Sequence, residues 1–170
     1  MCFKFEMAII YSCLIVLIFW TWPASGQHFT DCGGELSADS GSVGTITSPY
    51  FPNNYPLFSN CTWIIRCNDV GQNVVINFEN FELEDTGLTD FCRFDWVSLD
   101  NGVLIGNADL GLFCGGPSTS GILPPANGIV SNESAVTINF RSDFLFNFSG
   151  FNLTYTCIGY GFFPKCIACF

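Results

Sequence analysis

Apolar and polar residues alternate with a period of two along most of the chain beyond residue 27, and helical spacing is hard to find. The clearest example is Asn60–Cys67, in which Cys61, Trp63 and Ile65 share one face and the residues between them share the other. Successive side chains of a β-strand point to opposite faces of its sheet, so this alternation predicts a half-buried strand. The same pattern recurs in three further segments, Asn73–Glu79, Val136–Phe140 and Phe151–Cys157.

Another pair of apolar segments predicts a β-hairpin. Phe94–Leu99 is followed by the turn residues Asp100-Asn101-Gly102 and then by Val103–Ile105. Such a turn between two strand-like segments is a hairpin signal. Short alternating strands separated by Gly, Pro, Asn and Asp predict an all-β fold, an antiparallel β-sandwich.

The N-terminus has the pattern of a secretory leader. Its uncharged segment, Ala8–Trp20, is shorter than the ~20 residues that a membrane-spanning helix needs. Small residues at Ala24 and Gly26 are typical of a signal-peptidase site, so we expect residues 1–26 to be a signal peptide that is cleaved before Gln27. An uncleaved signal anchor is the alternative. No second apolar span follows.

Residues 27–170 correspond to about one domain and are strongly acidic. Without Lys4 and Glu6, the chain keeps 4 of its 5 basic and 14 of its 15 acidic residues, a net charge of −10. This charge argues against nucleic acid and anionic membrane surfaces as partners. It favours a cationic protein or a divalent cation.

Eight cysteines follow the leader, at positions 32, 61, 67, 92, 114, 157, 166 and 169. In an exported chain such a set indicates a disulfide framework, whereas in the cytosol it would suggest metal or redox chemistry. A zinc site at Cys166 and Cys169 would need two more ligands, and His28 is the chain's one histidine. These two cysteines are left with three alternatives: a local disulfide, an intermolecular link, or a truncated downstream module. Four glycosylation sequons, at Asn60, Asn132, Asn147 and Asn152, support export.

Enzymatic activity has little support in the sequence. A Ser-His-Asp or Cys-His arrangement would depend on His28, which lies next to the expected new N-terminus. Acidic residues are plentiful enough for a glycosidase pair, but solvated acidic loops are the simpler interpretation in a secreted β-domain. We therefore expect a protein that is not an enzyme.

Several short motifs, taken together and in order, resemble a CUB domain. Those of the first half are Cys32-Gly33-Gly34, Gly44-Thr45-Ile46-Thr47-Ser48-Pro49, Pro52-Asn53-Asn54-Tyr55-Pro56 and Asn60-Cys61-Thr62-Trp63-Ile64-Ile65. Those of the second half are Phe81-Glu82-Leu83-Glu84, Cys92-Arg93-Phe94-Asp95, Phe113-Cys114-Gly115, Phe140-Arg141-Ser142-Asp143 and Gly150-Phe151. The resemblance covers 32–157 and leaves 158–170 as a short cysteine-containing tail. It implies a disulfide-stapled, jelly-roll-like β-sandwich of the kind found in complement-initiating proteases, tolloid-type proteinases, cubilin, neuropilins and spermadhesins.

The family pattern implies the disulfides Cys32–Cys61 and Cys92–Cys114. Cys67 and Cys157 are additional to the four cysteines of that pattern. Cys67 shares the inward face of its strand with Trp63, and Cys157 shares that of its strand with Phe151 and Tyr155. Two inward cysteines on different strands predict a third, buried bridge. The alternative is a pair of buried free thiols, which pack as small hydrophobes.

The resemblance also implies a calcium site. Glu84, Asp95 and Asp143 match the acidic ligands of the calcium-binding subset of CUB domains, and Tyr55 matches the tyrosine that supports them. Calcium prefers six to eight hard oxygen ligands, and a cation offsets the repulsion between gathered carboxylates. The simpler alternative is ordinary surface acids. One departure is that Phe144-Leu145-Phe146 follows Asp143 where the family often supplies an amide, and a glycan on Asn147 would crowd the same rim.

The function implied by the resemblance is a secreted, calcium-dependent module for protein binding, adhesion or recognition. Its acidic site at Tyr55, Glu84, Asp95 and Asp143 would accept a Lys or Arg of an extracellular partner protein. One alternative is an N-terminal regulatory CUB module, or a fragment, of a larger secreted protease. A spermadhesin-like sugar-binding role is a third possibility, and the oligomeric state is left open.

Overall fold

The protein is described by a computed structural model that places residues 28–29, 32–84, 91–104, 106–117 and 120–159. Within these ranges the chain forms ten β-strands and no helix. The strands are β1 (His28–Phe29), β2 (Gly34–Ala38), β3 (Val43–Thr47), β4 (Asn60–Cys67), β5 (Gln72–Glu82), β6 (Trp96–Asn101), β7 (Gly111–Phe113), β8 (Ile129–Val130), β9 (Ala135–Arg141) and β10 (Gly150–Gly159).

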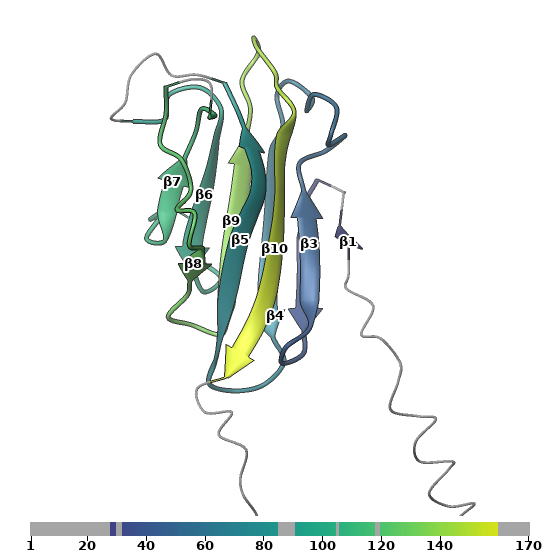
Figure 1. Ribbon diagram of the computed structural model, residues 1–170, viewed down its shortest axis with the longest axis vertical. Helices are drawn as coiled ribbons and strands as arrows, with labels where there is room; N and C mark the ends of the chain where they lie inside the picture. The colour runs from purple at the N-terminus through teal and green to yellow at the C-terminus, as the bar shows by residue number, and fades with distance from the viewer. Residues whose placement is uncertain (1–27, 30–31, 85–90, 105, 118–119, 160–170) are drawn as a thin grey trace, which may run out of the picture.

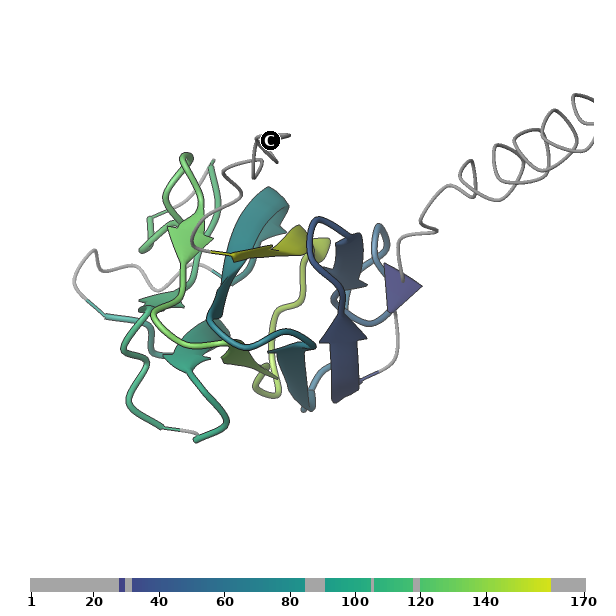
Figure 2. The same ribbon diagram turned by 90° about the horizontal axis from the view of Figure 1, so that it is seen from below.

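The strands form two five-stranded sheets that face each other (Figures 1 and 2). One sheet has the order β1-β3-β10-β5-β8 and the other β2-β4-β9-β6-β7. The expected all-β sandwich of antiparallel strands is confirmed. Two pairs at the sheet edges, β1 with β3 and β2 with β4, are parallel instead.

The core lies between the sheets and follows the alternation of the sequence. In β4, Cys61, Trp63 and Ile65 are buried, and in β10 the same is true of Phe151, Leu153, Tyr155 and Cys157. The rings of Trp63 and Phe151 meet edge to face across the two sheets, with their centroids 5.9 Å apart. Burying a large apolar side chain stabilises a fold by about 1.5–3 kcal/mol, so these inward positions carry much of the stability.

Three disulfides lie within the described residues. Cys32 is joined to Cys61 and Cys92 to Cys114, the two pairings that the family pattern implies. Cys67 is joined to Cys157, as the shared inward faces led us to expect. This last bridge links β4 in one sheet to β10 in the other, and it therefore closes the sandwich at one end.

The prediction of a hairpin between Phe94–Leu99 and Val103–Ile105 is wrong. β6 pairs with β7, and the side chains of Val103 and Leu104 are exposed. The cause is Asp100, which is 2% exposed and whose Oδ1 accepts the backbone N–H groups of residues 106, 107 and 108 at 3.3, 2.8 and 2.6 Å. The carboxylate gathers these amides into a loop, because a buried carboxylate needs hydrogen-bond donors. The returning strand therefore begins only at Gly111.

Several expectations fall outside the described residues. They are the signal peptide 1–26 with its cleavage before Gln27, and Cys166 and Cys169 in the tail. In the part of the chain that the structure describes, no helix is long and apolar enough to span a membrane.

Candidate metal and partner-binding site

The four expected site residues come together at one end of the sandwich. This end carries the β3–β4 and β9–β10 loops, which lie at the top of Figure 1. Tyr55 lies in the β3–β4 loop and Glu84 lies just beyond β5. Asp95 directly precedes β6, and Asp143 follows β9. Because β5 and β9 end where β6 begins, residues far apart in the sequence meet on one rim.

The carboxylates of Glu84, Asp95 and Asp143 form a tight cluster. One oxygen of each lies within 4.8 Å of the others. Glu84 is 6% and Asp95 0% exposed, while Asp143 is half-buried. Burial, followed by repulsion from Asp143 and then Asp95, raises the pKa of Glu84 to about 7. Burial is also the main cause that raises the pKa of Asp95.

Asp95 is oriented from both sides. The Tyr55 hydroxyl donates a hydrogen bond to Asp95 Oδ2 at 2.6 Å, and the backbone N–H of Asp143 donates to Asp95 Oδ1 at 2.7 Å. Tyr55 is itself fixed, since its ring is buried and packs edge to face on Phe140 at 5.1 Å. Burial, with the hydrogen bond to Asp95 second, raises the pKa of this tyrosine, so it stays a donor.

Glu84 differs from Asp95 in the surroundings of one carboxylate oxygen. Its Oε2 is buried and has no hydrogen-bond partner among the residues that the structure describes. Buried polar atoms are nearly always paired in folded proteins, and one without a partner calls for an explanation such as an ion. Oxygens on opposite sides of one calcium ion lie about 5 Å apart, because each Ca–O distance is about 2.4 Å. The spacing and the all-oxygen donor set of this cluster fit that ion.

Asn147 is a residue whose structural role the sequence analysis missed. Its side-chain amide donates a hydrogen bond to the backbone oxygen of Tyr55 at 2.8 Å, and its Oδ1 accepts one from Asn54 Nδ2 at 3.3 Å. These bonds join the β9–β10 loop to the β3–β4 loop that carries Tyr55. The sequon was the only signal at this position, and it gave no hint of the contact.

The other sequons lie in different surroundings. Asn60 at the start of β4 and Asn132 between β8 and β9 are exposed, whereas Asn147 and Asn152 are partly buried. Their glycosylation stays a prediction.

The protein-family model described as CUB domain matches residues 32–155 of this chain. Human neuropilin-2 is 34% identical over 142 residues, which cover 83% of this chain and 14% of neuropilin-2. Human tolloid-like protein 1 is 34% identical over 134 residues, covering 78% of this chain and 12% of the relative. The chain thus spans a small part of these relatives.

Solved structures agree with the family match. The CUB1-EGF-CUB2 domain of human MASP-1/3 is 31% identical with a TM-score of 0.59, covering 69% of this chain and 42% of that one. The MASP-1 CUB2 domain, whose structure is described as bound to Ca2+, is 29% identical with a TM-score of 0.51, covering 78% and 98%. CUB domains are non-catalytic binding modules of extracellular proteins. On its sequence and its fold, this chain belongs to the CUB domain family.

Proposed function

We propose that this protein is a secreted module that binds a partner protein through a calcium-organised site. The observation that carries the proposal is Glu84 Oε2, a buried oxygen in a cluster of three carboxylates for which the described part of the chain offers no hydrogen-bond partner. A cation is the simplest group that would both satisfy this oxygen and offset the repulsion. The calcium-bound MASP-1 CUB2 domain, similar in fold, supports the choice of ion.

Glu84, Asp95 and Asp143 would hold the ion. When bound, calcium supplies the positive charge that lets three carboxylates share one rim. The protein itself orients the ligand side chains before the ion binds. Tyr55 and the Asp143 amide fix Asp95, and Asn147 fixes the loop of Tyr55. Affinity of about 10⁻⁴–10⁻³ M would suffice outside cells.

The partner would present a Lys or Arg side chain. The three carboxylates of the acidic cluster and one calcium ion together carry a single net negative charge, which attracts a cationic group. The chain's net charge of −10 adds a longer-range attraction for basic surfaces.

Export is part of the proposal. Three disulfides suit an oxidising compartment, and residues 1–26 have the pattern of a signal peptide. We expect the mature protein to start at Gln27 and to carry N-glycans on at least one of Asn132, Asn147 and Asn152.

A second candidate is that this CUB domain serves within a longer protein, such as a secreted protease that it regulates. Neuropilin-2 and tolloid-like protein 1 are much longer than the matched region, which favours this possibility. The transcript from the secreting tissue would decide. A downstream reading frame with a Gly-Asp-Ser-Gly-Gly or His-Glu-x-x-His motif would support it.

Calorimetry with calcium tests the site directly. We expect the wild-type protein to bind one calcium ion and the Asp143→Asn variant to bind it at least about tenfold more weakly, because one ligand charge is lost. Asparagine keeps an oxygen for the N–H of Leu145, which Asp143 Oδ1 accepts at 2.8 Å. Asp39→Asn, which neutralises an acid outside the cluster, is the matched control and should bind like the wild type. Equal binding by all three proteins would show that the cluster is not the site.

A further inference from the structure

We infer that the partner carries apolar side chains next to its basic residue, and that these dock on an apolar rim beside the acidic cluster. The apolar rim consists of Leu57, Phe58, Phe144, Leu145 and Phe146. The inference rests on the proposed function and names the kind of partner segment that the site would select.

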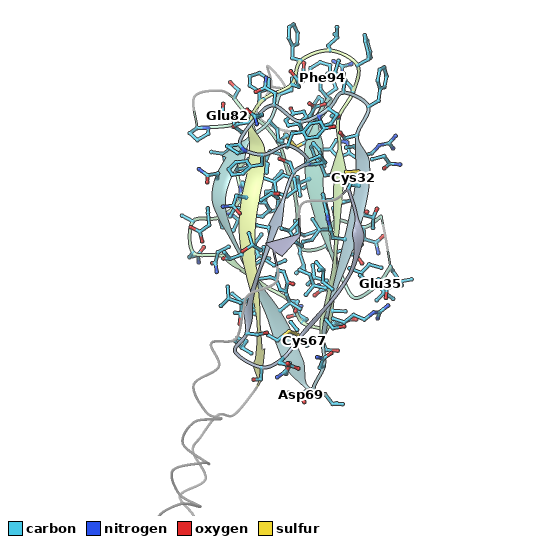
Figure 3. The ribbon with its side chains drawn as sticks, turned by 90° about the vertical axis from the view of Figure 1, so that its right-hand side faces the viewer. Cys32, Glu35, Cys67, Asp69, Glu82 and Phe94 are labelled. Carbon is cyan, nitrogen blue, oxygen red and sulfur yellow. A yellow bond between two sulfur atoms is a disulfide. The ribbon has the colours of Figure 1, made fainter. Side chains whose placement is uncertain are left out.

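The side chains of the apolar rim are exposed to solvent, although apolar side chains are usually buried. Phe58, Phe144, Leu145 and Phe146 are between 51% and 74% exposed. Phe58 and Phe144 belong to different loops but stack on each other, with ring centroids 6.4 Å apart and planes 24° from parallel. Figure 3 shows ring side chains projecting from the loops at the end of the molecule where Phe94 is labelled. Single exposed apolar residues are ordinary, but a contiguous apolar group marks an interaction site.

The apolar rim is attached directly to the cluster through Asp143. The backbone N–H of Phe58 donates to the backbone oxygen of Asp143 at 2.7 Å. The N–H of Leu145 donates to Asp143 Oδ1 at 2.8 Å. One residue therefore belongs to the acidic cluster and also holds both loops of the rim.

The backbone of Phe58 supports a role in contact with another molecule. Its φ is +57°, in the left-handed region that bulky residues rarely adopt. Such a conformation costs on the order of 1 kcal/mol or more. A phenyl ring that is 74% exposed returns little of that cost through burial within the chain. Contact with a partner accounts for a phenylalanine at this position.

Charge favours a protein segment over a membrane as the occupant. The apolar rim borders three carboxylates on a chain of net charge −10, which anionic lipid headgroups would oppose. A segment with Lys or Arg beside aromatic or aliphatic side chains complements both parts of the surface. Aromatic and Arg side chains are also the ones enriched in binding hot spots.

A peptide array tests the inference. One set of peptides has a central Lys and a matched set has a central Gln, with the neighbouring positions either apolar or Ser and Gly, all in about 2 mM calcium chloride. We expect the wild-type protein to prefer Lys to Gln and to prefer apolar neighbours about tenfold. Phe58→Ser/Phe144→Ser should keep the Lys preference and lose the preference for apolar neighbours. Val70→Ser/Leu104→Ser, which removes two exposed apolar side chains elsewhere, should behave like the wild type.

The possible failures are distinguishable. If wild type and Phe58→Ser/Phe144→Ser share the same preference for neighbours, the inference is wrong while the proposed function stands. If the wild type does not prefer Lys, or binds no peptide, both are wrong. Vesicles of phosphatidylcholine with and without phosphatidylserine complete the test. Calcium-dependent vesicle binding that only Phe58→Ser/Phe144→Ser loses would assign the rim to membranes and overturn the inference. Unchanged calcium affinity in calorimetry confirms that the variant keeps its site.

Discussion

Glu84 makes the candidate site sensitive to pH near neutrality. Its pKa rises from the ordinary 4.5 to about 7, so a proton competes with any cation for this carboxylate. We expect calcium affinity to be constant above about pH 8 and to fall by up to tenfold for each pH unit below 7. Calorimetry across this range measures the effect. A flat affinity profile would contradict the involvement of Glu84.

In the ion-free protein, the raised pKa of Glu84 makes the free energy of unfolding depend on pH. Because the folded state binds the Glu84 proton more tightly than the unfolded state, protonation stabilises the fold. That contribution is fully present below about pH 4.5 and is lost as the pH rises through about 7. Denaturation in chelator should therefore show this loss, and Glu84→Gln should remove it. Calcium should restore stability at the higher pH.

The hydrogen bond from Tyr55 to Asp95 should contribute measurably to stability. Tyr55→Phe keeps the buried ring but removes the donor to Asp95 Oδ2. We expect the free energy of unfolding to fall by about 1–3 kcal/mol, because a buried carboxylate oxygen loses a partner. Urea denaturation in chelator measures this change. The exposed Tyr50 provides the control, and equal losses for Tyr50→Phe and Tyr55→Phe would refute the role of the bond.

At the scale of single residues, the resemblance identified the charged groups but not their setting. Glu84, Asp95 and Asp143 were expected to converge, and they do. Phe58 was missed, because neither its left-handed φ nor its bond to Asp143 leaves a mark in the sequence. Phe144-Leu145-Phe146 was noticed only as a missing amide, although three apolar residues in a loop beside an acid could have suggested a contact surface.

At the scale of elements, alternation predicted the strands better than their partners. The segments around Trp63, Ile76, Ile138 and Leu153 are strands with the expected inward faces. The hairpin after β6 was wrong because Asp100 was interpreted as a turn residue, whereas its buried carboxylate organises the loop. A period of two gives the face of a residue, but strand pairing also depends on such long-range contacts.

The length of chain that a disulfide encloses affects how much it stabilises the fold. Cys67–Cys157 spans 90 residues and Cys32–Cys61 spans 29. On the chain-entropy model these loops correspond to about 4–5 and 3–4 kcal/mol. We therefore expect Cys67→Ala/Cys157→Ala to lower the free energy of unfolding more than Cys32→Ala/Cys61→Ala. Denaturation of the two double variants compares them, and the reverse order would show that packing outweighs loop closure here.

At the scale of the whole molecule, the two sheets and the disulfides determine what calcium adds. Because the core between the sheets and three bridges already link the strands, we expect the β-sandwich to stay folded in chelator. A ligand that binds only the folded state stabilises it by RT ln(1 + [L]/Kd). With calcium at about 2 mM and a Kd of about 10⁻⁴–10⁻³ M, this amounts to about 0.6–1.8 kcal/mol.

Chelation should therefore lower the melting temperature by only a few degrees, because about 1 kcal/mol shifts a domain of this size by roughly 3–5 °C. Scanning calorimetry with calcium and with chelator measures the shift, and Asp143→Asn, with its tenfold weaker binding, should show no more than about a third of it. Unfolding in chelator would mean that the ion is needed for the fold itself. A melting temperature that is the same at every calcium concentration would mean that the three carboxylates hold no calcium, and partner binding would then have to depend on the apolar rim or on another surface.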